Sequence, residues 1–394
     1  MDQSLVAFSD ASTLYGNIIK IKALESHEAE ITLDVVNETM LDYDMSLLKQ
    51  ETNFFTPYFY FFTFITKDSL FIDELEKLMK QGKTIQISLS KINNNNCGTL
   101  VYIDRKNKIS QDYYFEFLDV ECKLSEYNSL IDKLLKQKQV VNDKNKNEIL
   151  TSIFNFGIIS KINFSVYHVG YGHASYFIFN KNSKGFYDIG FTKFITEDSS
   201  VPAYSISNHK PKWVILSHWD IDHYSGVVNY KPLNCFSIPW IAPDEYSKHF
   251  AFNRIVGLLN FYGGSLYLVD RSFTGYNYLN YFYLLKGIGK QANNSGLFIA
   301  INNQYKMMSL GDLDYRYLPK DLPFYDVDYL VIPHHGSFQS GICPFKTHDI
   351  EAQAIVPVGF NNYENPSRIM LNVLQNRGFK IHDTYQDKSF YGFL

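Results

Sequence analysis

The sequence predicts an α/β protein in which a layered C-terminal domain follows a separate, strand-rich N-terminal domain. After residue 161, short apolar stretches typical of strands alternate with helical stretches, as in layered α/β domains. Before about residue 127, stretches rich in β-branched and aromatic residues dominate, and they predict the strands of a mixed α+β domain. A chain of 394 residues is long enough to form both cores.

We expect the first domain over residues 1–150 and the second over residues 160–394. The boundary is placed in residues 136–148, where lysine and asparagine replace apolar residues, as in a solvated linker. Within the first domain, Asp68 and Gly82 have the residue types that begin and end a helix. The sequence shows no chemical motif there, so the role of this domain is open among substrate recognition, oligomerisation and docking to a partner protein.

A last helix is predicted near the C-terminus. Asn365 is the expected N-cap and Pro366 the first helical residue. In that register, Ile369, Leu371 and Leu374 face the core. The second domain is therefore expected to end in a helix that packs on a sheet.

The composition excludes several classes of protein. A chain with 45% hydrophobic and 20% charged residues is neither disordered nor collagenous. Its net charge of 37 − 41 = −4 gives no general attraction to nucleic acid, so a phosphate-bearing partner must be bound at a local site or through a metal. The four cysteines are isolated and the N-terminus lacks a secretory signal, which predicts a cytoplasmic protein. The most apolar stretch, residues 54–65, is shorter than the roughly 20 residues of a membrane span, so no membrane contact is expected.

The strongest chemical signal is a group of potential metal ligands that follows a predicted strand ending at Ser217. His218, Asp220, Asp222 and His223 lie within six residues. Two carboxylates and two imidazoles crowded together need a compensating cation or strong hydrogen bonds. The spacing lets the first two converge on one point and the last two on another, which indicates two nearby metal ions.

Two further segments have the same arrangement of a strand followed by ligands. Asp312 comes after an apolar strand and a glycine, and His334 and His335 come after another strand. Each segment alone is typical of an exposed turn. Together with the first group they indicate a two-metal hydrolase in which Asp312 bridges the ions.

Seven segments in order resemble the metallo-β-lactamase superfamily, and in particular the β-lactamase-like domain of ComEC-type DNA-uptake proteins. They are VGYGHAS, YDIG, SHWDIDHYSG, NNSGLFIAI, SLGDLD, VIPHHGS and VGFNNYENP, and they cover about residues 163–394. The resemblance implies an αβ/βα four-layer sandwich for the second domain. The channel segments of ComEC are absent, so the resemblance concerns the hydrolase module alone.

The resemblance also implies ligand roles. Asp222 and His223 are expected to bind one ion and His218 and Asp220 the other, with Asp312 bridging. The carboxylate at 220 stands where the superfamily usually has a histidine, so the ligand set has one more hard oxygen donor and more negative charge. We therefore expect two divalent ions, zinc or manganese, with magnesium as a further option.

The roles of the remaining site residues follow from the same resemblance. His335 is the favoured ligand and His334 the phosphate contact or proton donor, although the reverse order is open. Asp222 and His334 are the expected catalytic residues, and Asp188 is expected to orient the ligand loop from behind. His249 is the one nearby candidate for a ligand histidine that many relatives have, and we interpret it as a surface residue.

Substrate contacts are predicted at four positions that border the expected cleft. His173 and Asn365 stand where ComEC-like domains usually have an acid and a histidine, and Asn294 and Ser337 are candidate phosphate contacts. A local basic groove is expected from four side chains near these segments: Lys306, Arg316, Lys320 and Arg368.

These features predict a phosphodiesterase or nuclease that uses a metal-activated water, with DNA or RNA as the leading substrate. No GxSxG elbow, P-loop or GxGxxG segment indicates acyl-serine or nucleotide-cofactor chemistry instead. Two alternatives stay open. One is hydrolysis of a small molecule such as a cyclic nucleotide, a phosphate ester or a lactone. The other is a partner-activated or interaction subunit of a multi-protein bacterial system, with a protein partner or a second copy bound by the N-terminal domain.

Overall fold

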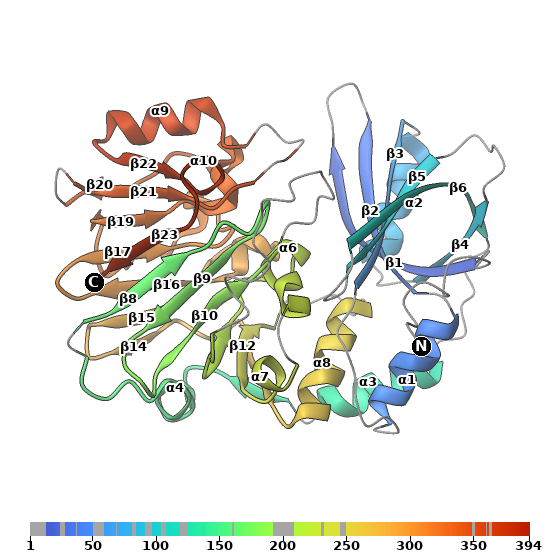
Figure 1. The fold of residues 1–394 in the computed structure, drawn as a ribbon, viewed down its shortest axis with the longest axis horizontal. Coiled ribbons are helices and arrows are strands. Elements are labelled where there is room, and N and C mark those ends of the chain that lie inside the picture. Colours follow the sequence, from blue (N-terminus) through green and yellow to red (C-terminus); the bar gives the residue numbers. More distant parts are fainter. Residues whose placement is uncertain are drawn as a thin grey trace. The chain divides into compact units, whose positions relative to one another are not determined.

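The chain divides into two compact units (Figure 1). Unit 1 consists of Met1–Gln137 and Ser247–Tyr262, and unit 2 consists of Lys138–Tyr246 and Gly263–Leu394. The computed structural model describes residues 13–23, 28–36, 38–49, 59–67, 69–80, 84–90, 97–103, 108–118, 125–136, 138–159, 161–191, 209–229, 232–244, 250–348, 351–359, 361 and 365–394.

Unit 1 is built on a closed six-stranded barrel in which every neighbouring pair is antiparallel. The strand order is β1-β2-β3-β5-β6-β4, with bounds β1 (Thr13–Ala23), β2 (Ala29–Val36), β3 (Phe59–Thr66), β4 (Thr84–Ser90), β5 (Cys97–Ile103) and β6 (Lys108–Leu118). Its helices are α1 (Glu38–Leu48), α2 (Ser69–Lys80), α3 (Ser125–Leu135) and α8 (Phe250–Tyr262). The helix expected between Asp68 and Gly82 is confirmed as α2.

Helix α8 comes from the second half of the sequence but packs in unit 1. Arg254 forms a bidentate ion pair with Asp44, with Nε 3.0 Å from Oδ1 and a terminal nitrogen 2.8 Å from Oδ2, and both side chains are fully buried. The Asp34 carboxylate accepts a hydrogen bond from the Ala251 backbone amide at the start of α8. Burial, and then the Asp44 charge, raise the pKa of the neighbouring Tyr127 hydroxyl. The expected range 160–394 therefore differs from unit 2, because this segment completes the other core.

Unit 2 also begins earlier than expected. Residues 139–148, taken as a solvated linker, instead contain strand β7 (Gln139–Val141) and the start of helix α4 (Lys146–Phe154). Strand β7 pairs in parallel with β13, and Val141 and Leu150 are buried in the core. Of the lysines that suggested a linker, Lys144 and Lys146 lie between these two buried residues, and Lys136 and Lys138 precede them.

Unit 2 is mixed α/β and contains two large sheets and a small one. The first large sheet has the order β23-β8-β9-β10-β11-β12-β13-β7, with β8 (Asn163–Val166), β9 (Ala174–Ile178), β10 (Lys184–Ile189), β11 (Trp213–Ile215), β12 (Pro239–Pro243), β13 (Ser265–Val269) and β23 (Phe390–Phe393). The second has the order β14-β15-β16-β17-β19-β21-β22, with β14 (Tyr276–Tyr278), β15 (Phe282–Lys286), β16 (Leu297–Asn302), β17 (Lys306–Ser309), β19 (Tyr329–Val331), β21 (Gln353–Val356) and β22 (Lys380–Asp383). Strands β18 (Asp326–Val327) and β20 (Lys346–Thr347) form the small sheet.

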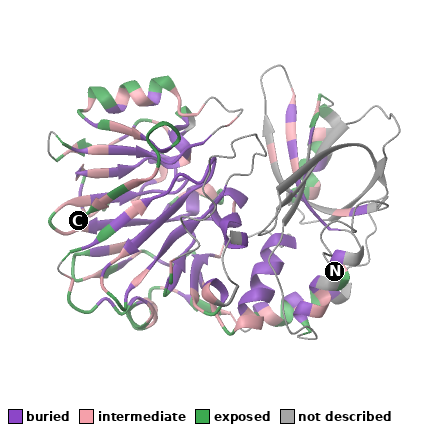
Figure 2. Ribbon diagram, viewed as in Figure 1, coloured by how far each residue is buried: buried purple, intermediate pink, exposed green. Residues whose placement is uncertain are grey.

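One core fills the space between the two large sheets, and it contains inward side chains of both, such as Trp213 and Ile299. A second core lies on the other face of the β14–β22 sheet and includes Met370 and Leu374 of helix α9 (Arg368–Asn376). Figure 2 shows that the central strands of unit 2 are mostly buried, whereas outer strands such as β22 and β23 contain intermediate and exposed residues. Across the described segments, no helix combines the length and apolar character that crossing a membrane requires.

Helix α9 corrects the predicted C-terminal helix. It begins at Arg368 with Ser367 at the N-cap position, so the expected start at Asn365 and Pro366 was too early. Leu374 is buried as expected, but Ile369 is 56% exposed and Met370 is buried in its place. The prediction was wrong because Pro366 packs beside Gly336 ahead of the helix instead of forming its first turn.

Candidate metal centre

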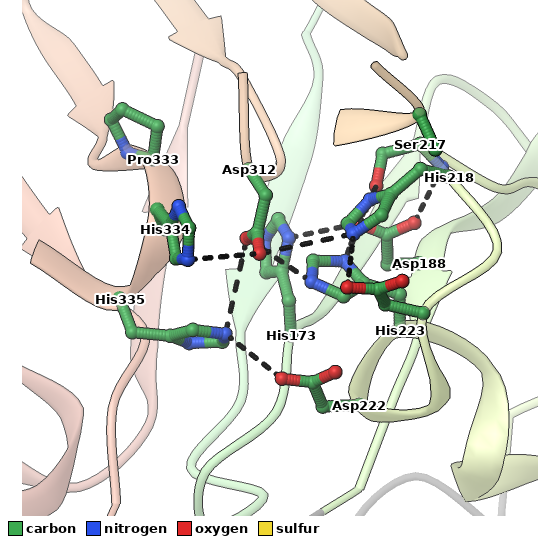
Figure 3. Close-up of polar contacts among 12 residues, drawn as sticks. His173, Asp188, Ser217, His218, Asp222, His223, Asp312, Pro333, His334 and His335 are labelled. Carbon is green, nitrogen blue, oxygen red and sulfur yellow. Dashed lines mark hydrogen bonds and ion pairs between the residues drawn. The ribbon is translucent and has the colours of Figure 1, made fainter. Parts of the chain in front are cut away.

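The predicted ligands come together at one edge of unit 2 (Figure 3). The strands β11, β17 and β19 are each followed by a ligand segment, and β17 and β19 are parallel neighbours. Short helices carry two of the segments: α6 (Ile221–Tyr224) and the 3₁₀ turn η6 (Pro333–Gly336). Because each segment leaves its strand at the carboxyl end, residues more than 90 positions apart in sequence meet at this edge.

Asp312 lies at the centre of the cluster. Its Oδ1 is 3.1 Å from His223 Nε2 and 3.9 Å from His335 Nε2. Its Oδ2 is 3.8 Å from His218 Nε2 and 3.9 Å from His334 Nε2. The two carboxylate oxygens therefore face different histidines, as expected of a carboxylate between two sites.

Two further carboxylates each lie beside one histidine of the cluster. Asp222 Oδ2 lies 3.4 Å from His335 Nε2, and Asp220 Oδ2 lies 3.5 Å from His218 Nε2. Among the described residues, three groups have all their ligand atoms within 4.8 Å of one another: His218, His223 and Asp312; Asp222, His223 and His335; and, behind them, His173, Asp188 and His223. In the third group the close atoms of Asp188 and the two histidines are already hydrogen-bonded to each other.

Exposure separates the site into an inner and an outer part. The side chains of Asp220 and His334 are 29% and 25% exposed, whereas the other five ligand candidates are at most 5% exposed. Figure 3 shows His334 and His218 on opposite sides of Asp312. His334 is thus the accessible member of the histidine pair.

The backbone of the histidine pair is held in an uncommon conformation. His334 and His335 have φ of 52° and 54°, and Gly336 follows at 79°, so three successive residues are left-handed. The His334 amide donates to the Gly311 carbonyl at 3.0 Å, which ties this turn to the Asp312 loop. Such conformations cost free energy in residues other than glycine, and they cluster at functional sites.

Hydrogen bonds fix which nitrogen each buried histidine presents. His335 Nδ1 donates to the Pro357 carbonyl at 2.7 Å, and His223 Nδ1 lies 2.8 Å from Asp188 Oδ2. His218 Nδ1 lies 2.9 Å from Ser217 Oγ, whose own hydrogen is donated to Asp188. With Nδ1 as the donor in these hydrogen bonds, Nε2 is the nitrogen of each ring that faces the cluster.

The atoms at the centre fit a metal ion better than they fit each other. Within the described residues, Nε2 of His218, His223 and His335 and Oδ1 of Asp312 are buried without a hydrogen-bond partner of acceptable geometry. Buried polar atoms are rarely left in this state. Divalent cations bound within the cluster would satisfy these atoms, because imidazole nitrogen and carboxylate oxygen are their usual ligands.

The charges of the carboxylates and histidines in the cluster are strongly coupled. Burial alone would raise the pKa of Asp312, but His223 and then His334 hold it well below its usual range. Burial would lower the pKa of His223, but the Asp312 and Asp188 carboxylates raise it well above its usual value. Without metal, a proton on His223 therefore balances the two carboxylates.

This balance predicts that metal affinity rises with pH. The raised pKa of His223 means that the proton is present at neutral pH and must leave when a metal binds Nε2. As pH rises toward that pKa, the competition weakens and the apparent dissociation constant falls. Zinc titrations by calorimetry in two buffers of different ionisation enthalpy should show proton release. Binding with no proton release and no pH dependence would contradict this protonation state.

Asp188 lies behind the ligands and is fully buried. Its Oδ1 accepts from the Ser217 amide at 2.7 Å, and its Oδ2 accepts from the Ser217 hydroxyl at 2.8 Å and lies beside His223. The role of Ser217 was not predicted from the sequence, although this residue directly precedes His218 and lies two positions after β11. The residue links Asp188 to the first ligand loop.

His173 does not fit the predicted role of substrate contact. Its side chain is 2% exposed, and its two ring nitrogens lie 3.0 Å from Asp188 and 3.0 Å from Ser175. Because both nitrogens are engaged and the ring is buried behind the ligands, it has no atom to offer a substrate.

Two other predicted contacts instead support the loops of the site. Asn294 is buried, and its Oδ1 accepts from the Asp314 amide at 3.1 Å. Asn365 Nδ2 donates to the Tyr171 hydroxyl at 3.0 Å, and the Tyr171 ring packs on His335 with centroids 4.2 Å apart. Tyr171 is a second residue that sequence reasoning missed.

The remaining predicted residues are placed as follows. Ser337 is 9% exposed, and its amide donates to the His334 carbonyl at 2.9 Å. Lys306 begins β17, at the end away from Asp312, and pairs with Asp326 at 2.6 Å, so it does not extend a basic groove to the site. His249 lies outside the described residues.

Comparisons with known proteins give no family assignment. No protein-family model matches the sequence, and no curated protein matches it significantly. Solved structures that resemble the chain include a single-substitution mutant of the CmlA β-hydroxylase, with 9% identity, a TM-score of 0.34, and coverage of 81% of this chain and 72% of that one. They also include an N-acyl homoserine lactone hydrolase with its product at a catalytic metal centre, with 11% identity, a TM-score of 0.27, and coverage of 58% and 95%. TM-scores this low do not assign a fold.

Proposed function

We propose that this chain is a metal-dependent hydrolase of the metallo-β-lactamase superfamily. The observation that carries the proposal is the set of three buried histidines, each fixed through Nδ1, whose Nε2 atoms converge on Asp312 and Asp222. The order of these ligands along the chain and two large sheets with a shared core further support it. The four-layer sandwich, the ComEC-like branch and a cytoplasmic location belong to the same proposal.

We assign the ligands to two divalent ions. Asp222, His223 and His335 would hold the inner ion and His218 and Asp220 the outer one, with Asp312 shared. When bound, such ions lower the pKa of a coordinated water and stabilise negative charge on the attacked group. Zinc and manganese are the expected metals, and the carboxylate at 220 favours manganese or magnesium more than a histidine would.

The protein's own residues would position the substrate and move protons. His334 is accessible, lies beside Asp312 and is fixed by its strained turn, so it suits contact with a substrate oxygen or protonation of a leaving group. Asp222 is buried against His335 and keeps the inner ligands in place. Ser337, one turn further, orients His334 through its backbone carbonyl.

A phosphodiester, in DNA, RNA or a smaller molecule, is the proposed substrate class. Arg316 lies four residues after Asp312, and its side chain is 64% exposed while it pairs with Asp314 at 3.0 Å, so we propose it as the cation that contacts an anionic substrate. A small phosphate ester or a lactone as substrate is the alternative within the same chemistry. Activation by a protein partner, through unit 1, is a further option.

A hydrolysis assay tests the function. The purified full chain, with added manganese, magnesium or zinc, is given single- and double-stranded DNA, RNA and bis(p-nitrophenyl) phosphate. Metal-dependent cleavage of a polynucleotide supports a nuclease, and cleavage of the small diester alone supports a small phosphodiester. A metal-loaded protein that is silent on every substrate would contradict a self-sufficient phosphodiesterase.

His334→Ala should separate metal binding from catalysis. Because His334 is the exposed histidine and His335 the buried one, the variant is expected to keep its metal and lose about 100-fold or more in rate, the usual scale for a positioned proton donor. Metal content and the rate on the small diester are measured together. His335→Ala is the matched comparison and should lose metal. If the metal losses of the two variants are reversed, the assignment of the pair is wrong.

A further inference from the structure

His173 is buried and contacts two of the ligand candidates, Asp222 through its backbone and His223 through its ring. Its Nδ1 lies 3.0 Å from Asp188 Oδ2, its Nε2 lies 3.0 Å from Ser175 Oγ, and its backbone amide donates to the Asp222 carbonyl at 3.0 Å. The ring stands edge-on to His223, with centroids 5.8 Å apart. The His173 side chain thus contacts Asp188, which in turn binds His223. The His173 backbone amide separately contacts α6, so a change of the side chain leaves that hydrogen bond in place.

Four hydrogen-bond donors converge on Asp188. The Ser217 amide binds Oδ1, and the Ser217 hydroxyl, His223 Nδ1 and His173 Nδ1 all lie within 3.0 Å of Oδ2. An ionised carboxylate only accepts, so both imidazoles carry hydrogen on Nδ1. His173 Nε2 is then an acceptor for the Ser175 hydroxyl, which fixes the ring in this tautomer.

We propose that His173 is a positioning residue for the metal centre, which acts through Asp188 to fix the orientation and tautomer of His223. The inference rests on the proposed function only in that the cluster binds a divalent cation. His173 binds the same Asp188 oxygen, Oδ2, that His223 binds, and so keeps that oxygen directed at His223 Nδ1. Groups that hydrogen-bond directly to a ligand imidazole, as Asp188 does to His223, typically change metal affinity by 10- to 100-fold, and His173 acts through that group.

Two conservative variants distinguish this role from simple filling of the core. The amide nitrogen of His173→Asn occupies about the position of Nδ1 and can still donate to Asp188. The amide of His173→Gln reaches about the position of Nε2, so it keeps the Ser175 contact and loses the Asp188 contact. Zinc affinity of the metal-free full-length protein is measured by competition with a chromophoric chelator, and its melting temperature is measured alongside.

We expect His173→Gln to weaken zinc binding about 10-fold or more, and His173→Asn to stay within about threefold of the unaltered protein. The same pair is then made with Asp188→Asn. Because His173 acts through Asp188, the difference between Asn and Gln at 173 should disappear in that background. The ligand-field absorption of bound cobalt reports the coordination geometry of the metal, to which His223 contributes, and it should shift in His173→Gln.

Several results would overturn the inference. Equal losses of zinc affinity in His173→Asn and His173→Gln would show that His173 only packs in the core. A loss of affinity that adds fully to that of Asp188→Asn would show the same. Unchanged affinity in a folded His173→Gln would do the same, and if that variant does not fold, full affinity in His173→Phe serves as the equivalent test. Failure of the unaltered protein to bind zinc, manganese or cobalt would instead overturn the proposed function.

Discussion

Asp312→Ala is expected to remove the bound metal and to lower hydrolysis at least about a thousandfold, because both carboxylate oxygens serve the cluster. His223 and His218 would lose their shared anionic partner. The metal content after dialysis and the rate on the small diester are measured on the same preparation. Folding is checked by the melting temperature, since the variant also removes a buried charge.

Asp314→Ala is the matched control. Asp314 lies two residues further along the same loop, but its carboxylate pairs with Arg316 at 3.0 Å and lies outside the cluster. The backbone amide that holds Asn294 is unaffected by this change. Asp314→Ala should keep its metal. Full metal occupancy and full activity in Asp312→Ala would refute the two-metal site.

Arg254→Leu is expected to destabilise unit 1 by about 3–5 kcal/mol, the scale found when one partner of a buried ion pair is removed. Asp44 would keep its charge in a fully buried position, without the two bonds at 3.0 and 2.8 Å that now compensate it. Hydrogen exchange measured by mass spectrometry on peptides of the barrel strands reports this loss. The three tryptophans, Trp213, Trp219 and Trp240, all lie in unit 2, so their fluorescence follows unit 2 separately.

Two variants serve as controls for Arg254→Leu. Lys67→Ala removes an ion pair in the same unit, but Lys67 is 77% exposed, so the cost should stay below about 1 kcal/mol. The double variant Asp44→Leu with Arg254→Leu should recover much of the lost stability, because no unpaired charge stays buried. Faster exchange confined to unit 2 would contradict the assignment of α8 to unit 1.

The ligand segments could be predicted because each places several metal-binding residue types directly after an apolar strand. His218 to His223, Asp312 and the histidine pair all lie together in the structure. The roles of His173 and Asn365 could not be predicted. Both lie within motifs, but which way a loop side chain points depends on partners far away in sequence, such as Asp188 and Tyr171.

The boundary between the two units could not be predicted from the sequence, for a related reason. Residues Phe250 to Leu259 of α8 are all buried, so their pattern shows that the helix lies in a core but not in which one. Its membership depends on Asp44 and Asp34, more than 200 positions earlier. The start of α9 was predicted too early for a local reason. Proline is common in the first turn of a helix, so the sequence alone does not show that Pro366 precedes α9.

The insertion of α8 has a consequence for biosynthesis. The barrel strands end at Leu118, yet the helix that holds Asp44 and Asp34 is translated only at residues 250–262, after more than a hundred intervening residues. During translation, unit 1 therefore cannot complete its core until α8 has been synthesised. By then β7 to β12 of unit 2 have already emerged from the ribosome. A fragment that stops near residue 150 would lack this helix, and a fragment that starts there would carry it without its core. The two units are thus expected to be made as a single product and not as separable halves.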